Sequence, residues 1–302
     1  RRDLSAGFRA ERVSLDVEDF TRPAAGLLTA AGVFPLTAVD VIGGEFDYDA
    51  IVGNLGFVYK LSPATSIYGG FSQGLSLPDV GAYTRRAIAS AGETSVSFAS
   101  IRPEAQIVDT WELGMRYNAQ RVSIDSSVYL STSDEGVVFD SATNEITQQK
   151  ERVRGAEYSL DNAMREDWSV EALLANVEGR QDSDGDGEID SWLPNNRIPT
   201  PFTATLYTDR SLDSGLTLSG ELVFSAKRSH PDLPHLEDMF TVNLGGSYPV
   251  GPGVVSFGVS NLFDRQQENS TASSVRVNPL TGDAVRGADE GRRVALGYSV
   301  SF

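Results

Sequence analysis

The chain contains no cysteine among its 302 residues, and lysine is almost as scarce. Without cysteine, neither a disulfide nor a thiolate metal site can hold the fold together, which excludes a small disulfide-stapled secreted domain. Lysine occurs only at Lys60, Lys150 and Lys227, so arginine supplies the other cationic side chains. The formal net charge of −17 argues against a nucleic-acid partner, because binding to phosphates requires a basic surface.

The sequence also lacks a long hydrophobic run. A membrane-spanning helix needs about 18 apolar residues, whereas the longest run here, 24–34, is broken by Thr29 and bracketed by Pro23 and Pro35. We interpret this run as a loop. A helical membrane protein is therefore excluded, but a β-barrel is not, because barrel strands average to near-neutral hydropathy. No signal peptide begins at Arg1, so we expect a secreted chain to stand here in mature or truncated form.

The most informative feature that is present is alternation of apolar and polar residues. In the last segment, Val294, Leu296 and Tyr298 alternate with Ala295, Gly297 and Ser299. Alternation at period two is typical of a strand with two different faces. By this criterion about twelve strands are expected, near 3–18, 45–61, 65–75, 105–118, 121–138, 147–162, 167–181, 200–211, 215–229, 236–249, 253–266 and 291–302. The predicted fold class is all-β.

The links between these strands alternate strictly between short and long. Tight turns are expected at 62–65, 118–120, 165–167, 213–215 and 251–253, and longer links at 19–44, 76–104, 139–146, 182–199, 230–235 and 267–290. Outer-membrane barrels place short turns on one side of the membrane and long loops on the other. We therefore predict an antiparallel transmembrane β-barrel, with its apolar face against lipid.

Two details refine this prediction. The apolar phase slips at 11–12 in the first strand and at 53–54 in the second, which a β-bulge would explain, although the first slip also fits a tight hairpin. Aromatic residues fall near the short turns, where a membrane–water girdle would lie; ordinary core aromatics are the alternative. These residues are Tyr59, Tyr68, Tyr117, Trp168, Tyr248 and Tyr298.

Several short motifs resemble those of TonB-dependent outer-membrane receptors, in the family's order. They are 67–79 (IYGGFSQGLSLPD), Pro103-Glu104 followed by 109–114 (DTWELG), 154–157 (RGAE), 196–199 (NRIP, with Thr200 in place of a second proline), 260–264 (SNLFD) and the terminal Phe302. Each motif is weak alone, but together they cover 67–302. The chain is identified as similar to the C-terminal part of such a receptor barrel.

This resemblance implies a gated importer of ferric siderophores or similar iron complexes in the outer membrane of a Gram-negative bacterium, powered through TonB. Such receptors have 22 strands and a plugged lumen, so residues 1–302 are expected to form the C-terminal portion of the barrel, with the plug absent. The implied partners are the iron complex, the TonB complex through an N-terminal part, the barrel assembly machinery, and outer-membrane lipid and lipopolysaccharide. Phe302 corresponds to the family's terminal aromatic, its assembly signal. Ligand-contact residues do not carry over.

The clearest local chemistry is an acidic stretch in an expected external loop. Asp182, Asp184, Asp186 and Asp190 stand at positions 1, 3, 5 and 9 of an EF-hand-like pattern, with glycine at position 6 and Glu188 at position 7. Alternate carboxylates can converge on one hard cation, so we predict a calcium site. The bidentate glutamate of position 12 is missing, which predicts weak binding; a solvated acidic loop is the alternative.

Other candidates are weaker, and each has a simpler interpretation. His230 and His235 flank a Pro-Asp-Leu-Pro segment, and we favour metal-free loop histidines. The pairs Arg85-Arg86 and Arg292-Arg293 are interpreted as charged strand margins rather than as sites for an anionic iron complex or lipopolysaccharide phosphates. Polar residues expected on the inner face are predicted to line a wet lumen, namely Asp125, Glu157, Glu221 and Asn243. No nucleophile–base pair is recognised, so we predict that the chain is not an enzyme.

Three functions are consistent with these features. The leading hypothesis is the barrel part of a siderophore receptor. The second is a truncated receptor that acts as a passive pore or an inactive remnant, because gating has no evident basis without a plug. The third is a soluble, calcium-binding β-sandwich such as an adhesin or lectin, which would keep the alternating strands but bury their apolar face.

Overall fold

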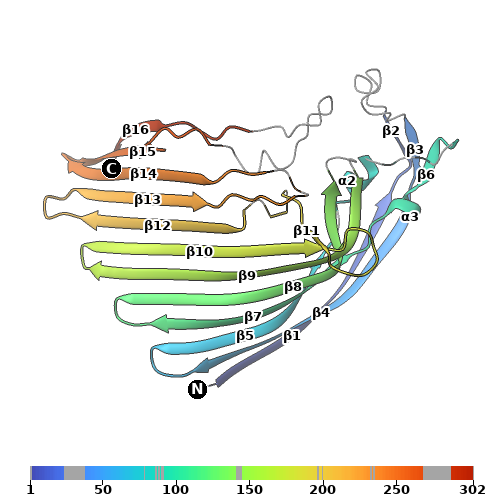
Figure 1. Ribbon diagram of the computed structural model, residues 1–302, viewed down its shortest axis with the longest axis horizontal. Helices are drawn as coiled ribbons and strands as arrows, with labels where there is room; N and C mark the ends of the chain where they lie inside the picture. Colours follow the sequence, from blue (N-terminus) through green and yellow to red (C-terminus); the bar gives the residue numbers. More distant parts are fainter. Residues whose placement is uncertain are drawn as a thin grey trace.

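Twelve long strands form one antiparallel meander in the computed structural model (Figure 1). The structure describes residues 2–23, 38–77, 79–85, 87, 89, 92–140, 145–195, 197–198, 200–231, 233, 235–267 and 287–301. The long strands are β1 (Arg2–Val17), β4 (Gly44–Lys60), β5 (Thr65–Ser76), β7 (Gln106–Asn118), β8 (Val122–Asp140), β9 (Glu145–Arg165), β10 (Trp168–Gln181), β12 (Phe202–Ser211), β13 (Thr217–Ser225), β14 (Met239–Val250), β15 (Gly253–Ser260) and β16 (Arg293–Val300). Each corresponds to one predicted strand, which confirms the all-β expectation.

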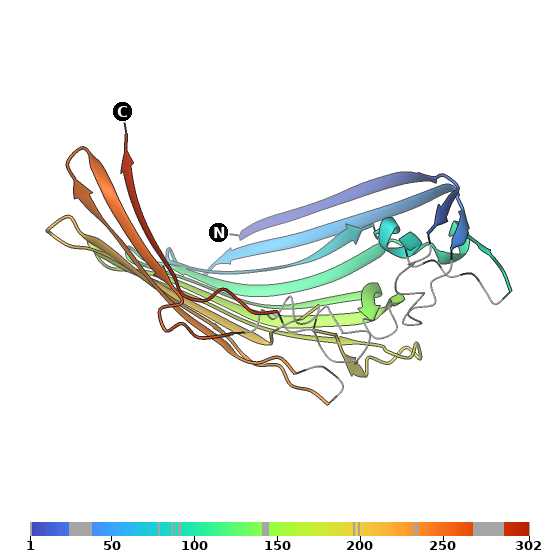
Figure 2. The same cartoon turned by 90° about the horizontal axis from the view of Figure 1, so that it is seen from above.

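The sheet is curved but open (Figure 2). Its order runs from β1 to β16, with the two-residue strand β11 (Ser191–Trp192) added to β10, and the two end strands are not paired with each other. The two termini lie at these free edges. The described chain is therefore a partial barrel wall.

The two faces of the sheet differ in chemistry. We call the face that Leu15 and Phe46 present to Phe98 the inner face; the strand registers then fix the face of every other strand residue. Large exposed apolar side chains gather on the outer face, among them Leu4, Phe8, Ile51, Leu55, Trp111, Leu113, Val128, Leu206, Leu244, Phe257, Val294 and Leu296. Asp125, Glu157, Glu221 and Asn243 share the inner face, as predicted.

The two phase slips do not come from bulges, so that prediction is wrong. The pairing of β1 with β4 keeps one register from Arg2 to Val17, and that of β4 with β5 is equally regular. Instead, the apolar residues change sides along the strand. Leu4 and Phe8 are 81% and 84% exposed on the outer face, whereas Leu15 and Val17 pack inward against a small cap. Register shifts occur elsewhere, at Ser133/Gly136 and Trp168/Ser169.

Close cross-strand contacts accompany this pairing on the inner face. Tyr68 is paired with Gly114, where an added Cβ would lie 2.3 Å from the tyrosine ring. Tyr129 covers Gly155 in the same way, at 2.5 Å. Each aromatic ring fills the space that a neighbouring side chain would need, a pairing known to support glycine in sheets. Both glycines are therefore required by packing.

The short connections lie at one end of the sheet, the turn side, and the long ones at the other, the loop side, as predicted. The long connections contain structure where the sequence pattern predicts only loop. Strands β2 (Phe20–Arg22), β3 (Val39–Ile42) and β6 (Ser95–Ser97) form a small sheet, and helices α2 (Val80–Arg85) and α3 (Phe98–Ile101) lie beside it. No helix in the described part of the chain is long and apolar enough to cross a membrane. The run 24–34 lies outside the described residues.

This small sheet and the two helices form the cap. Phe98 is fully buried with Val41 and Ala87, and its ring meets Phe46 of β4 edge-on, with 5.0 Å between the ring centres. A second apolar cluster joins Leu193 and Ile198 under the connection that follows β11. The described apolar core therefore sits at the loop side, and not between two sheets as a β-sandwich would require. The structure does not support the sandwich alternative.

Candidate functional site

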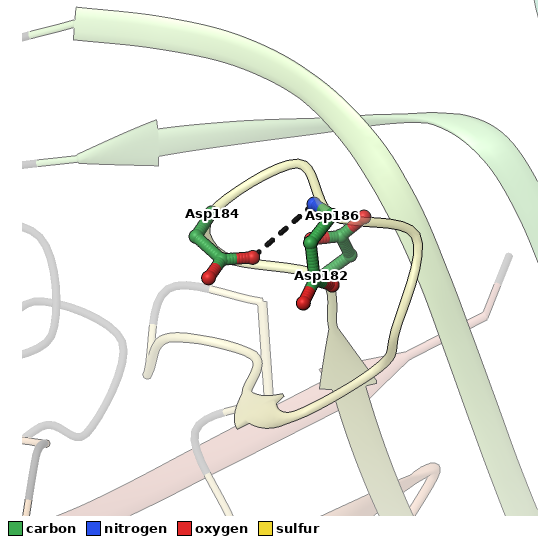
Figure 3. A group of neighbouring side chains, drawn as sticks. All are labelled: Asp182, Asp184 and Asp186. Carbon is green, nitrogen blue, oxygen red and sulfur yellow. Dashed lines mark hydrogen bonds between the residues drawn. The ribbon is translucent and has the colours of Figure 1, made fainter.

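The acidic stretch folds into a tight loop directly after β10 (Figure 3). Asp182, Asp184 and Asp186 each offer one carboxylate oxygen, and these oxygens lie within 4.8 Å of one another. Gly185 and Gly187 have positive φ angles of 80° and 93°, which glycine adopts without strain. The backbone therefore turns sharply enough to bring alternate carboxylates together, as the spacing predicts.

Asp182 anchors this loop. Its side chain is buried, and its two oxygens accept hydrogen bonds from the amides of Gly185 at 2.7 Å and Gly187 at 2.9 Å. Burial raises the pKa of the Asp182 carboxyl. The hydrogen bonds from these amides and the charge of Lys150 lower it by more, so that the net pKa lies below its ordinary value. The carboxylate is ionised at neutral pH.

The other predicted ligands do not join this group in the described structure. The carboxylate of Asp190 accepts hydrogen bonds from the amide and hydroxyl of Ser183, and closes the base of the loop. Glu188 is exposed, and its backbone amide donates to Asp186 at 2.8 Å. Three of the five predicted residues thus come together, and hard oxygen ligands of this kind suit a calcium ion. Calcium binding remains a prediction.

A buried arginine that the sequence patterns do not reveal holds the neighbouring connection. Arg228 is 2% exposed and donates to the carbonyls of Leu193 (2.6 Å) and Ile198 and to the side-chain oxygen of Asn195 (3.2 Å). Burial lowers the pKa of its guanidinium to about 10, so the group stays charged at neutral pH. A lone arginine after a strand carries no sequence signal of such a role.

Residues of the family-like motifs make hydrogen bonds and ion pairs that hold strands and connections together. Arg197 makes a two-pronged ion pair with the buried Glu151, at 2.9 and 3.0 Å. Gln73 links three strands, since it donates to Asp109 at 2.9 Å and accepts from the amide of Gly53 at 3.1 Å. Asn261, with a φ of 48°, exchanges hydrogen bonds with the backbone of the residue four positions later. Phe302 lies outside the described residues.

The two histidines have different neighbours. His230 stacks on Trp192, with 4.1 Å between ring centres, and the Nε2 atom of His235 lies 3.1 Å from a carboxylate oxygen of Glu237. Asp232 between them lies outside the described residues. Among the residues that the structure describes, the histidines belong to no metal-ligand group. Their interpretation as metal-free loop histidines stays a prediction.

The structure describes the side chains of only one of the two arginine pairs. Arg292 and Arg293 lie near acidic groups, at 3.7 Å from Asp264 and Glu290 respectively, which agrees with a charged strand margin. The Arg85 side chain and all of Arg86 lie outside the described part of the chain.

The inner face carries polar side chains around shallow hollows. Asp125 accepts from the Tyr68 hydroxyl at 2.6 Å and from Arg116 at 2.7 Å, and Asn243 donates to Glu221 at 2.7 Å. One hollow of about 390 Å³ is bordered by Tyr68, Asp125 and Glu157. Asp125, Glu221 and Asn243 are hydrogen-bonded and Glu157 is exposed, and polar groups spread along one face in this way suit a wet lumen more than a catalytic centre.

Comparison with known proteins supports this interpretation of the wall. A family model described as TonB dependent receptor-like, beta-barrel, matches residues 3–262. The chain is 28% identical to the ferric aerobactin receptor of Klebsiella pneumoniae over 99% of its own length, and 27% identical to that of Escherichia coli. It is 30% identical to the rhizobactin receptor of Rhizobium meliloti over 52% of its length. The chain spans 42% of either aerobactin receptor.

Solved structures share the fold at lower identity. The ferric yersiniabactin uptake receptor FyuA from Yersinia pestis has a TM-score of 0.76 and 15% identity, over 100% of this chain and 43% of that one. The copper transporter OprC has a TM-score of 0.73 and 17% identity, over 97% of this chain and 44% of that one. With the family model matching most of the sequence, the chain belongs to the TonB-dependent receptors and forms part of their β-barrel domain.

Proposed function

We propose that this chain is part of the wall of an outer-membrane receptor that takes up a ferric siderophore or a similar iron complex. The observation that carries the proposal is its similarity to ferric aerobactin receptors along 99% of its length. The two chemically different faces of the sheet support it, because an apolar outer face suits lipid and a polar inner face suits an aqueous path. The family consists of transport receptors and not of enzymes, which confirms that expectation.

Energy coupling through TonB is part of the proposal. In this scheme, another segment of the complete receptor contacts TonB, while the present strands supply the wall and the loop-side cap. Insertion would depend on the barrel assembly machinery, with Phe302 as the terminal aromatic signal. The passive-pore alternative keeps the same wall but requires no energy, so the energy requirement of uptake separates the two.

Uptake of radiolabelled ferric aerobactin tests this function. Iron-starved cells that carry the reading frame of this chain are compared with cells in which it is deleted. We expect deletion to abolish uptake, and a protonophore to do the same in intact cells. Unchanged uptake after deletion would overturn an aerobactin-type function, and uptake that resists the protonophore would favour a passive pore.

The outer-membrane location has its own test. Spin labels at Val128, Leu222 and Phe257, which share the outer face, are expected to be accessible to oxygen dissolved in the bilayer of reconstituted vesicles. A label at Ser127 on the inner face is the matched control, because it should respond to a water-soluble relaxing agent instead. Labels at the three outer positions that are shielded from oxygen would contradict the proposed location.

The acidic loop is included in the proposal as a weak calcium site. Its support is the convergence of Asp182, Asp184 and Asp186 on the loop side. Extracellular calcium-binding modules work at about 10⁻⁴ to 10⁻³ M, and calcium would order this loop beside the entrance to the lumen. Calorimetry with calcium on the complete receptor is expected to show binding that Asp184→Asn weakens. Binding that is equally strong in this variant would contradict the assignment.

A further inference from the structure

Two Asp-Gly pairs follow each other directly in the acidic loop. Asp184-Gly185 and Asp186-Gly187 are the only Asp-Gly pairs in the sequence, and all four residues are exposed. Glycine has no side chain, so its amide nitrogen can reach the carboxyl carbon of the preceding aspartate without a steric clash. An exposed Asp-Gly pair in a flexible chain is therefore open to a spontaneous backbone rearrangement that needs only water.

The rearrangement proceeds through a cyclic imide. The glycine amide nitrogen bonds to the side-chain carboxyl carbon of the aspartate, and the carboxyl hydroxyl leaves with the amide proton as a water molecule. Water then adds to either carbonyl carbon of the ring and breaks the bond from that carbon to nitrogen. Opening at one carbonyl restores aspartate, and opening at the other gives isoaspartate, in which the backbone runs through the former side chain. The water released in the first step balances the water consumed in the second, so no oxidant or reductant is required.

Both attacking nitrogens are held by the same carboxylate. The amide of Gly185 donates to one oxygen of the buried Asp182 at 2.7 Å, and the amide of Gly187 donates to the other at 2.9 Å. Removing the proton from either nitrogen would place a negative charge beside this carboxylate, which Coulomb repulsion opposes. It would also break a hydrogen bond to a charged group, which is stronger than one between neutral groups. Asp182 therefore disfavours the first step at both pairs.

The two carboxyl groups that would be attacked are also held. A side-chain oxygen of Asp184 accepts from the amide of Asp186 at 3.2 Å, the bond drawn in Figure 3. A side-chain oxygen of Asp186 accepts in the same way from the amide of Glu188 at 2.8 Å. Each carboxylate is thus bound to the amide two positions ahead of it instead of to the adjacent glycine. Packing gives no such protection, since a Cβ added to Gly185 would meet no atom within 4 Å.

We propose that Asp182 protects the acidic loop against isoaspartate formation at Asp184 and Asp186. This role is separate from calcium binding, because it uses only hydrogen bonds within the protein. Its loss has a structural consequence. Isoaspartate adds a methylene to the backbone and moves the free carboxylate, so the alternate spacing that brings these side chains together would be lost. Asp182 is thus a positioning residue that preserves the covalent structure of the loop.

The rate of isoaspartate formation tests the proposal. The complete receptor is aged at neutral pH with a chelator, so that the result does not depend on the proposed calcium site. Trypsin then releases residues 181–197, and mass spectrometry measures isoaspartate at positions 184 and 186. Asp182→Ala should raise both rates roughly tenfold or more, the rate equivalent of one hydrogen bond to a charged group. Equal rates in the variant and the unsubstituted receptor would overturn the proposal.

Asp190→Ala is the matched control in the same loop. It removes a carboxylate that accepts from the amide and hydroxyl of Ser183, but it leaves both glycine amides bound to Asp182. The two rates should therefore stay close to those of the unsubstituted receptor. An acceleration as large as that of Asp182→Ala would show that general rigidity of the loop protects the Asp-Gly pairs, and would overturn the role assigned to Asp182.

A second variant keeps the test valid if Asp182→Ala unfolds the loop. Asp182→Asn preserves the volume of the side chain but offers one acceptor oxygen in place of two and carries no charge. It cannot hold both glycine amides as the carboxylate does, so at least one Asp-Gly pair should form isoaspartate faster. Hydrogen exchange at Gly185 or Gly187 should become faster at the same pair, because the freed amide no longer donates to a carboxylate. Unchanged isoaspartate formation at both pairs in this variant would overturn the proposal.

Discussion

The turn-side and loop-side halves of β1 and β4 place their apolar side chains on opposite faces of the sheet. In the turn-side half, Leu4 and Phe57 point outward and are exposed, and the inner face is polar. In the loop-side half, Leu15 packs inward on the cap, whereas the outward positions carry Arg12 and Asp47 in an ion pair. The register does not change between the halves. The inward apolar residues of the loop-side half therefore meet the cap, and the proposed function assigns the outward apolar residues of the turn-side half to lipid.

The largest effect is expected when the cap loses its central side chain. Phe98 is fully buried, and Phe98→Ala should destabilise the cap by about 3–5 kcal/mol, because the cavity is lined by side chains that cannot all collapse into it. Hydrogen exchange should become faster in β3 and α3 but not in β12–β14. Leu296→Ala, on the exposed outer face, is the control. Faster exchange throughout the wall would contradict the separation of the two halves.

Next in size is a charge placed against lipid. Val128→Arg puts a cation on the outer face and should cost about 2–4 kcal/mol in a bilayer if the site is near its midplane. Ser127→Arg places the same charge on the inner face one residue away and should cost close to nothing. Unfolding by denaturant in lipid vesicles measures both. Equal losses of stability in the two variants would contradict the conclusion that the outer and inner faces have different surroundings.

A smaller effect is expected in the acidic loop. Because the pKa of Asp182 is lowered in the folded loop, its contribution to stability is present above the ordinary pKa of the carboxyl. The contribution is lost as the pH falls through the lowered folded value. Proteolysis of 183–189 at graded pH should therefore accelerate only in acid, and Asp182→Asn should abolish this dependence. A variant that keeps the pH dependence would contradict the role of Asp182 as anchor.

The smallest effect is expected at the surface ion pair of the loop-side half. Arg12→Gln breaks the contact with Asp47, and an exposed pair of this kind contributes little to stability because solvent screens its charges. The loss should shrink further at high salt, because mobile ions screen exposed charges. Thermal unfolding at two salt concentrations measures it. A large loss that does not change with salt would indicate that Arg12 does more than pair with its neighbour.

The sequence predicted the twelve strands and their faces well, because alternation at period two is a local signal that the register preserves. It failed at the phase slips near 11–12 and 53–54, because a change of surroundings and a bulge produce the same pattern. The cap was missed for a related reason. β2, β3 and β6 are only three or four residues long and gain their order from packing on distant strands.

The acidic loop was likewise predictable only in part from the sequence. The spacing of Asp182, Asp184 and Asp186 identified the loop, since the turn geometry is encoded by its glycines. Glu188 and Asp190 stand in the same pattern but do not join the group, because their places depend on hydrogen bonds that spacing does not encode. The role of Arg228 was hidden for the same reason, since its carbonyl partners lie 30 or more positions away.

The tryptophans lie at different heights along the strands, so their fluorescence can report on different levels of the sheet. The chain has 3 tryptophans, and each stands at a different height: Trp168 beside a tight turn, Trp111 among the exposed apolar residues of the outer face, and Trp192 stacked on His230 at the loop side. Variants that retain only one indole should therefore emit at separate wavelengths and respond separately to brominated lipids. Their spectra would follow insertion of the wall and folding of the loop side as independent events.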